Sequence, residues 1–243
     1  MLLANAGHVA QETLKTAWFL RRAGCAVTFL ALHGGNVRLD PLCDALAAAE
    51  AVWDPTLRLR FRARREGWLR DLPSIAELHR AQPNFVWLDS YDAVVVPGGH
   101  GSVFGAFLRD QRIIDAVAHA YQTGRTVGLL CHGPVVGALP STFGPAILQG
   151  QAIACWPRLY ETALGLLPGI GRYFVPAGQP VGRLAAQAGA EVHDAVLPGR
   201  RRHAMASGRL VTGRGPWSIR PFTDALLAAL QLTGRPLVEA DRT

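Results

Sequence analysis

Two hydrophobic stretches, each ending in a glycine-rich turn, decide the fold of this chain. They read YDAVVVPGGHG at residues 91–101 and TVGLLCHGP at residues 126–134. Short apolar runs of this length, bounded by glycine and proline, predict buried strands. A helical pattern lies between them, with Ile113 and Val117 on one face and Gly124 at its end. Strand, helix and strand in this order predict a right-handed crossover in a parallel sheet.

The same alternation continues on both sides of these stretches. It predicts strands at 2–4, 25–32, 152–155 and 210–212, a helix over 11–22 that ends at Gly24, and a C-terminal helix with Phe222, Leu226, Leu227 and Leu230 toward the core. The arginine-rich residues 40–85 predict a small helical insertion or cap. We therefore expect one α/β domain over residues 1–243, with a doubly wound, mostly parallel sheet and helices on both faces. Ligands of such folds bind beyond the carboxyl ends of the strands.

Composition excludes several classes of protein. Hydrophobic residues make up 49% and charged residues 18% of the 243, an ordinary globular balance. The sequence contains no run of about 18 apolar residues, so no membrane-spanning helix is predicted. Its first residues lack the basic region of a signal peptide. The net charge of +7 rests on 24 arginines and one lysine. Their clusters, at 58–65 and 200–202, lack the interleaved aromatics of a base-stacking surface. We expect a cytoplasmic protein without nucleic-acid or membrane partners.

One of the four cysteines stands apart. No C-x-x-C pair occurs, so no zinc ribbon is predicted, and Cys25, Cys43 and Cys155 are expected to be small buried hydrophobic residues. Cys131 instead follows a strand directly and precedes Gly133-Pro134, which is the strand–turn–helix pattern of a nucleophile elbow. The N-terminus of the following helix would favour its thiolate form. The alternative is an inert buried cysteine beside a helix start.

These motifs resemble the DJ-1/ThiJ/PfpI superfamily, which has the class I glutamine amidotransferase-like fold. Its signature is a strand ending in P-G-G-H-G and an elbow reading C-H-G-P, and LVTGRGPWS at 210–218 is similar to its late L-x-T-G-x-x-P-x-S segment. Within the superfamily, these motif sequences most resemble those of the glutathione-independent glyoxalase III enzymes and the related holding chaperones. The resemblance implies a flavodoxin-like sheet, a homodimer, and a lyase-type or hydrolase-type enzyme connected with the stress response.

The resemblance also assigns site residues. It places the catalytic nucleophile at Cys131 and its neighbouring histidine at His132. Glu12 falls on the family glutamate that shares a proton with the thiol; the alternative is an exposed acid at a helix start. Glu161, which follows Trp156-Pro157, falls on the acid that orients the histidine; the alternative is a plain surface glutamate.

The glycine-rich turn at 97–101 is expected to bind the substrate. Gly98 and Gly99 allow close backbone approach, and the N–H groups of Gly99 and His132 would form an oxyanion hole. His100 belongs to the same turn. No 2-His-1-carboxylate metal set and no G-x-G-x-x-G dinucleotide motif is evident, so no metal, nicotinamide or other cofactor is expected.

Three functions remain open at this stage. The first is a glyoxalase III-like conversion of a 2-oxoaldehyde to a 2-hydroxy acid. The second is another small-molecule reaction at the same elbow, by a hydratase, deglycase or amidase with a specialised, for example biosynthetic, substrate. The third is a non-catalytic holding chaperone or a redox sensor whose cysteine oxidises under peroxide.

Overall fold

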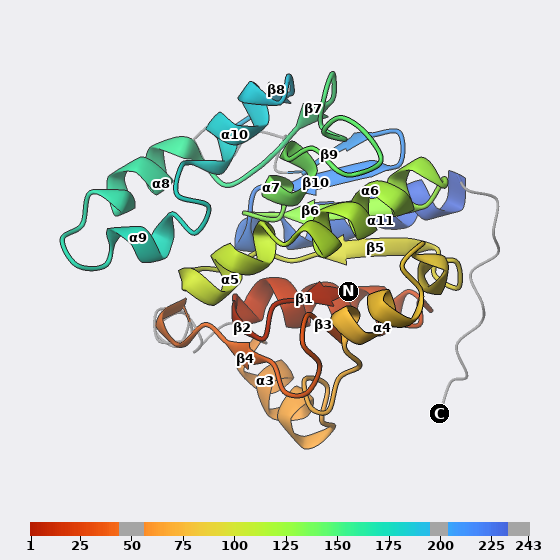
Figure 1. The fold of residues 1–243 in the computed structure, drawn as a ribbon. Helices are drawn as coiled ribbons and strands as arrows, with labels where there is room; N and C mark the ends of the chain where they lie inside the picture. Colours follow the sequence, from red (N-terminus) through yellow and green to blue (C-terminus); the bar gives the residue numbers. More distant parts are fainter. Residues whose placement is uncertain (44–55, 195–203, 233–243) are drawn as a thin grey trace.

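The computed structural model describes residues 1–43, 56–194 and 204–232 (Figure 1). Its central sheet has the strand order β5-β6-β10-β9. The strands are β5 (Ala93–Val96), β6 (Thr126–Leu130), β10 (Leu210–Gly213) and β9 (Ala204–Ser207). The first three are parallel, and β9 runs antiparallel to β10 at the edge. The predicted mostly parallel sheet is therefore confirmed.

Three further strand pairs are parallel and short. They are β1 (Leu2–Leu3) with β3 (Leu30–Ala31), β2 (Ala6–His8) with β4 (Arg38–Leu39), and β7 (Ala152–Ile153) with β8 (Glu191–Val192). β1 lies beside β5 and extends the central layer (Figure 1). The predicted strand over 25–32 is regular only at its last part, Leu30–Ala31.

Helices form the outer layers. In chain order they are α1 (Thr16–Arg22), α3 (Thr56–Arg65), α4 (Ile75–Ala81), α5 (Gly101–Leu108), α6 (Gln111–Gln122), α7 (Pro134–Ala138), α8 (Arg158–Gly165), α9 (Gly171–Phe174), α10 (Val181–Gln187) and α11 (Ile219–Leu232). A π-helical turn (Gln11–Lys15) precedes α1, and 3₁₀ turns occupy Val86–Leu88 and Pro216–Ser218. No helix in these described ranges combines the length and apolarity needed to cross a bilayer.

Alternating residues of β5 show that the sheet is covered on both faces. Val94 and Val96 pack in one hydrophobic cluster with Ile113 of α6, whereas Val95 packs in another with Phe222 of α11. Successive strand residues point to opposite faces, so α6 and α11 lie on opposite sides. At Gly128, a side chain would meet Phe222 and Leu226, so glycine there lets α11 approach the sheet. The doubly wound architecture follows from this packing.

The structure describes part of residues 40–85, the stretch for which a helical insertion or cap is predicted. Within 40–85 the described residues include α3 and α4, while residues 44–55 lie outside the described part of the chain. The basic cluster at 200–202 also lies outside it. α3 contributes Leu59 and Ala63 to a separate small core with Leu3 and Leu14. The helical segment therefore packs beside the first strand and helix of the domain.

Candidate active site

Cys131 occupies a sharp bend directly after β6. Its φ of 61° is a left-handed conformation, which few residues other than glycine adopt and which commonly marks functional sites. The bend is held from both sides, because the Cys131 N–H donates to Gly213 O at 2.8 Å and the Trp156 N–H donates to Cys131 O at 3.1 Å. A side chain at Gly133 would collide with Val96 O, so glycine is required for this turn. The strand–turn–helix geometry expected of a nucleophile elbow is present.

Glu12 reaches the same point from the π-helical turn before α1. It is fully buried, and its Oε2 accepts a hydrogen bond from the Gly98 N–H at 2.8 Å. A side chain on Gly98 would collide with both the Glu12 carboxyl group and Cys131, so the acid and the thiol meet over this glycine. Glu12 is thus no exposed acid at a helix start. π-Helical turns are frequent at functional sites, and this one aims a carboxyl group at the elbow.

Burial dominates the electrostatics of the pair. It raises the pKa of Glu12 to about 7, against the opposing hydrogen bonds with Cys131 and Gly98. Burial also raises the pKa of Cys131, and the neighbouring Glu12 carboxylate raises it further. The sequence predicts a thiolate favoured by a helix N-terminus, which the site does not support: α7 has only five residues, and an adjacent acid outweighs it. Near neutral pH the Cys131 thiol therefore stays protonated, and Glu12 is the member of the pair that gains or loses a proton.

The burial of Glu12 makes stability depend on pH. Because the folded pKa, about 7, lies above the ordinary 4.5, the stabilising contribution is complete below pH 4.5 and is lost as the pH rises through 7. Glu12→Gln stays uncharged and can still accept from the Gly98 N–H. We expect it to exceed the wild type in free energy of unfolding at pH 8 by up to about 3 kcal/mol, and to match it near pH 4. Thermal unfolding across this range measures the difference.

A matched control is Glu77→Gln, which alters an exposed acid in the first turn of α4. It should show no gain that grows with pH. A Glu12→Gln variant with the same stability difference at pH 4 and pH 8 would contradict the inferred titration.

His132 and Glu161 complete a chain of groups behind the thiol. The Cys131 Sγ lies 3.6 Å from His132 Nδ1, and His132 Nε2 lies 3.4 Å from Glu161 Oε1. Both side chains are fully buried. The other oxygen of Glu161 accepts from the Val181 N–H at 2.9 Å, which fixes the carboxyl group. Glu161, in the first turn of α8, is therefore no plain surface glutamate, although its long contact with His132 lacks regular hydrogen-bond geometry.

The two predicted oxyanion donors differ in their surroundings. The His132 N–H faces the Cys131 sulfur and interacts with it. The Gly99 N–H has no hydrogen-bond acceptor among the residues that the structure describes. Gly98, the second residue of the turn at 97–101, donates to Glu12 instead. Among the described residues the Gly99 N–H is thus left without an acceptor, whereas the His132 N–H contacts the sulfur.

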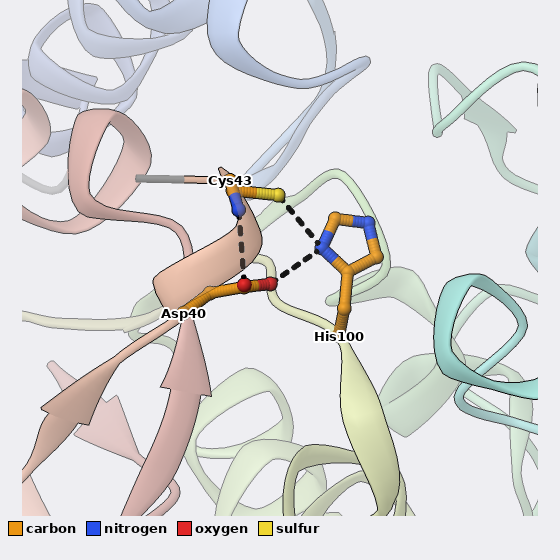
Figure 2. A group of neighbouring side chains, drawn as sticks. All are labelled: Asp40, Cys43 and His100. Atoms are coloured by element: carbon orange, nitrogen blue, oxygen red, sulfur yellow. Dashed lines mark hydrogen bonds and ion pairs between the residues drawn. The ribbon is translucent and has the colours of Figure 1, made fainter. Parts of the chain in front are cut away.

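Beside the elbow lies a group of three side chains, of which only His100 was predicted as a site residue, whereas Asp40 and Cys43 were not. Asp40 Oδ2 lies 3.1 Å from His100 Nδ1, and Cys43 Sγ lies 3.3 Å from the same nitrogen (Figure 2). The expectation that Cys25 and Cys43 are buried is wrong, because both are only half-buried. Asp40 and Cys43 belong to the arginine-rich stretch that gave no clear pattern. The signal that could have indicated them is their Asp-x-x-Cys spacing, which brings both side chains together over one helical turn.

An aromatic wall borders the elbow on another side. The rings of Trp156 and Trp217 stack with centroids 5.6 Å apart, and Trp156 lies 6.1 Å from the His132 ring. A side chain at Gly215 would contact both Trp156 and the Cys131 sulfur. The surroundings of the thiol are therefore narrow and partly apolar, which suits a small ligand.

The chain is similar to a known protein family and to several solved structures. The sequence model of the DJ-1/PfpI family matches residues 1–229. The chain is similar to the structure of glyoxalase III from Candida albicans, with a TM-score of 0.65 and 19% identity over 92% of this chain and 88% of that one. It is also similar to the Rapid Encystment Protein 24 kDa of Francisella tularensis, with a TM-score of 0.69 and 15% identity over 94% and 97%.

A further similar structure is DJ-1beta of Drosophila melanogaster, with a TM-score of 0.55 and 19% identity over 98% of this chain and 96% of that one. At these identities the likeness is one of fold. A search of curated proteins gives no significant match.

Proposed function

The chain belongs to the DJ-1/PfpI family, and on that premise we propose that it is a cysteine-dependent enzyme that converts a small 2-oxoaldehyde, such as methylglyoxal, into the corresponding 2-hydroxy acid. One observation carries the proposal. A thiol on a strained elbow lies beside a buried carboxyl group whose pKa is raised by burial to about 7. A carboxyl group that titrates near neutrality can both accept and return protons during turnover.

The first half of the reaction uses the thiol and the acid together. The Cys131 sulfur adds to the aldehyde carbon, and Glu12 takes the thiol proton and passes it to the aldehyde oxygen. While negative charge develops on that oxygen, the Gly99 N–H can stabilise it. The product of this step is a hemithioacetal on Cys131. No charge needs to leave the buried site during the addition.

The second half is an internal redox step. Glu12 removes the hydrogen on the former aldehyde carbon as a proton, which gives an enediol. A proton is then delivered to the carbon of the former ketone. This leaves the thioester of a 2-hydroxy acid, which one water molecule hydrolyses to release the acid and the free thiol. One 2-oxoaldehyde and one water give one 2-hydroxy acid. The aldehyde carbon is oxidised and the ketone carbon is reduced, so no external oxidant or reductant is needed.

Burial limits the size of the substrate. Cys131 is only 1% exposed, and Glu12 and His132 are fully buried. A large or peptidic substrate would have to displace the aromatic wall of Trp156 and Trp217. A compact, reactive carbonyl compound fits these surroundings better.

The proposal is tested by product analysis. The protein is incubated with methylglyoxal in the absence of glutathione, and lactate is measured. We expect one lactate for each methylglyoxal consumed, at a rate far above that of heat-denatured protein. Failure to form a 2-hydroxy acid from methylglyoxal, glyoxal or phenylglyoxal would contradict the proposed function.

Glu161 provides a prediction about a positioning residue. Glu161→Gln removes the negative charge beside His132 while an amide oxygen can still accept from the Val181 N–H. We expect kcat/KM to fall by roughly 10-fold to 100-fold, with little change in melting temperature and with a displaced pH profile. Glu161→Asp should recover part of the loss. An unchanged pH profile, or a loss explained entirely by unfolding, would contradict the positioning role.

A second candidate function is supported by the order of groups behind the thiol. Cys131, His132 and Glu161 are arranged in space in the order expected of a thiol hydrolase. In such an enzyme the histidine takes the thiol proton and the acid orients the histidine. Small amides or thioesters would then be substrates. Activity on such compounds that survives Glu12→Gln would favour this function, because hydrolysis does not require proton transfer between two substrate carbons.

A further inference from the structure

The group formed by Asp40, Cys43 and His100 takes no part in the reaction above, and we propose that it binds one divalent transition-metal ion, with zinc(II) as the best match to its ligands. Thiolate, imidazole and carboxylate are the three ligand types that zinc takes from proteins. A thiolate disfavours magnesium and calcium, which prefer oxygen ligands only. The proposal concerns binding and does not depend on the proposed function.

The geometry favours an ion over a proton relay. Asp40 Oδ2 and Cys43 Sγ both approach His100 Nδ1, at 3.1 and 3.3 Å (Figure 2). A Cys–His–Asp relay instead uses the two different ring nitrogens, one for each partner. The three potential ligand atoms all lie within 4.8 Å of one another. With zinc bonds of about 2.0–2.3 Å, tetrahedral ligands lie roughly 3.3–3.8 Å apart, so small shifts would complete the site.

The supporting contacts leave one carboxylate oxygen for the ion. Asp40 Oδ1 accepts from the N–H groups of Leu42 and Cys43, at 2.9 and 3.1 Å, and from the Tyr173 hydroxyl at 2.5 Å. These bonds fix the carboxylate, and Oδ2 remains directed at His100. Hydrogen-bonded outer partners of this kind are typical of metal-ligating carboxylates.

Protonation states also suit a cation. Burial would raise the pKa of Asp40, but hydrogen bonds from His100, Tyr173 and Cys43 lower it to about 2, so the carboxylate is charged. Burial lowers the pKa of His100, although Asp40 opposes this, so the imidazole is neutral at physiological pH. A neutral imidazole can offer a nitrogen lone pair to a metal.

Charge balance gives the reaction a defined stoichiometry. On binding, the Cys43 thiol loses its proton to solvent, and the His100 proton moves from Nδ1 to Nε2. Zinc(II), the Asp40 carboxylate and the Cys43 thiolate then sum to zero charge. Because buried charge is costly unless it is compensated, a neutral site is favourable. One proton is released for each zinc bound.

The location makes the site relevant to the reactive centre. The His100 ring packs edge-to-face against His132 with centroids 5.1 Å apart. Three protein ligands leave one position of a tetrahedron for water or for a ligand oxygen, as in catalytic rather than structural zinc sites. The expected ligand at that position is therefore a small oxygen donor.

Cobalt(II) is the probe for ligand identity. Metal-free protein titrated with cobalt(II) should develop a thiolate-to-metal charge-transfer band that saturates at one equivalent. Cys43→Ala should abolish this band, whereas Cys131→Ala and the control Cys25→Ala should retain it. A band that disappears with Cys131→Ala and persists in Cys43→Ala would overturn the assignment, as would the absence of any band.

Zinc affinity and proton release complete the test. Competition with a chromophoric chelator should show at least about a 100-fold weaker affinity in Asp40→Asn and His100→Ala, since even outer partners are worth 10-fold to 100-fold. Calorimetry of zinc binding in two buffers of different ionisation enthalpy should give about one proton released. If the Asp40 variant unfolds, Cys43→Ala must by itself lower the affinity. Equal affinity in folded Cys43→Ala overturns the proposal, whatever the protein does with methylglyoxal.

Discussion

Cys131→Ala is expected to abolish the turnover of 2-oxoaldehydes, with kcat/KM falling by at least about 10³-fold. The reason is that the hemithioacetal cannot form without the sulfur, and no other group at the elbow is a nucleophile of comparable strength. The fold should survive, because the left-handed bend is held by backbone hydrogen bonds to Gly213 and Trp156. Initial rates of lactate formation and circular dichroism of both proteins check the two parts of the prediction.

The matched control is Cys25→Ala, which removes a half-buried thiol that the reaction does not use. It should retain wild-type rates. If wild type and Cys131→Ala are equally inactive on a panel of aldehydes and suppress protein aggregation equally well, the enzyme hypothesis fails and the holding-chaperone alternative gains support.

Glu12→Gln should have the second-largest effect, a loss of about 10²-fold to 10⁴-fold in kcat. Glutamine can fill the same space and accept from the Gly98 N–H, but it can neither take the thiol proton nor transfer a proton between substrate carbons. The wild-type rate should rise with pH through about 7, as the Glu12 carboxyl group ionises. The variant should lack this rise.

The combination of stability and rate makes this prediction specific. The same substitution should stabilise the protein at pH 8 and slow the reaction, which a merely disruptive change would not do. A Glu12→Gln variant that is as fast as the wild type, or that keeps the rise near pH 7, would remove Glu12 from the mechanism.

The sequence predicted the three parallel strands of the central sheet well because they are short hydrophobic runs with glycine at or after their ends, whereas the edge strand β9 was not predicted. β5 and β6 lie within the predicted stretches, β10 extends one residue beyond its predicted range of 210–212, and Gly124 follows α6 as expected. The strand predicted at 25–32 was overestimated. Only Leu30 and Ala31 pair with β1, and apolar composition alone does not show which residues have a partner strand.

The site was predictable only where a motif exists. Cys131 follows from the elbow pattern, and His132, Glu12 and Glu161 follow from the resemblance. Nothing local indicates that Glu12 and Gly98, 86 positions apart, hydrogen-bond in the fold. The thiolate expected at Cys131 was a prediction from one nearby dipole. It did not weigh the Glu12 carboxyl group, which the resemblance places beside the thiol and which raises the pKa of Cys131.

Asp40 and Cys43 illustrate the remaining gap. Each is an ordinary residue in an irregular stretch, and their significance comes from His100, which is about sixty residues away. Contacts of this kind depend on how β4 and the turn after β5 come together. Hydrophobic periodicity contains no information about that approach.

The widened turn at Gln11–Lys15 has a consequence for how this chain could diversify. A π-helical turn holds one residue more than the α-helical turn it replaces, and each residue rotates a helix by about 100°. Deleting one residue from the turn would leave the packing of α1 intact and would rotate Glu12 away from the Cys131 sulfur. The deletion or insertion of a single codon would thus remove or restore the alignment of the Glu12 carboxyl group with the Cys131 sulfur. The side chains at the elbow would keep their chemical identity.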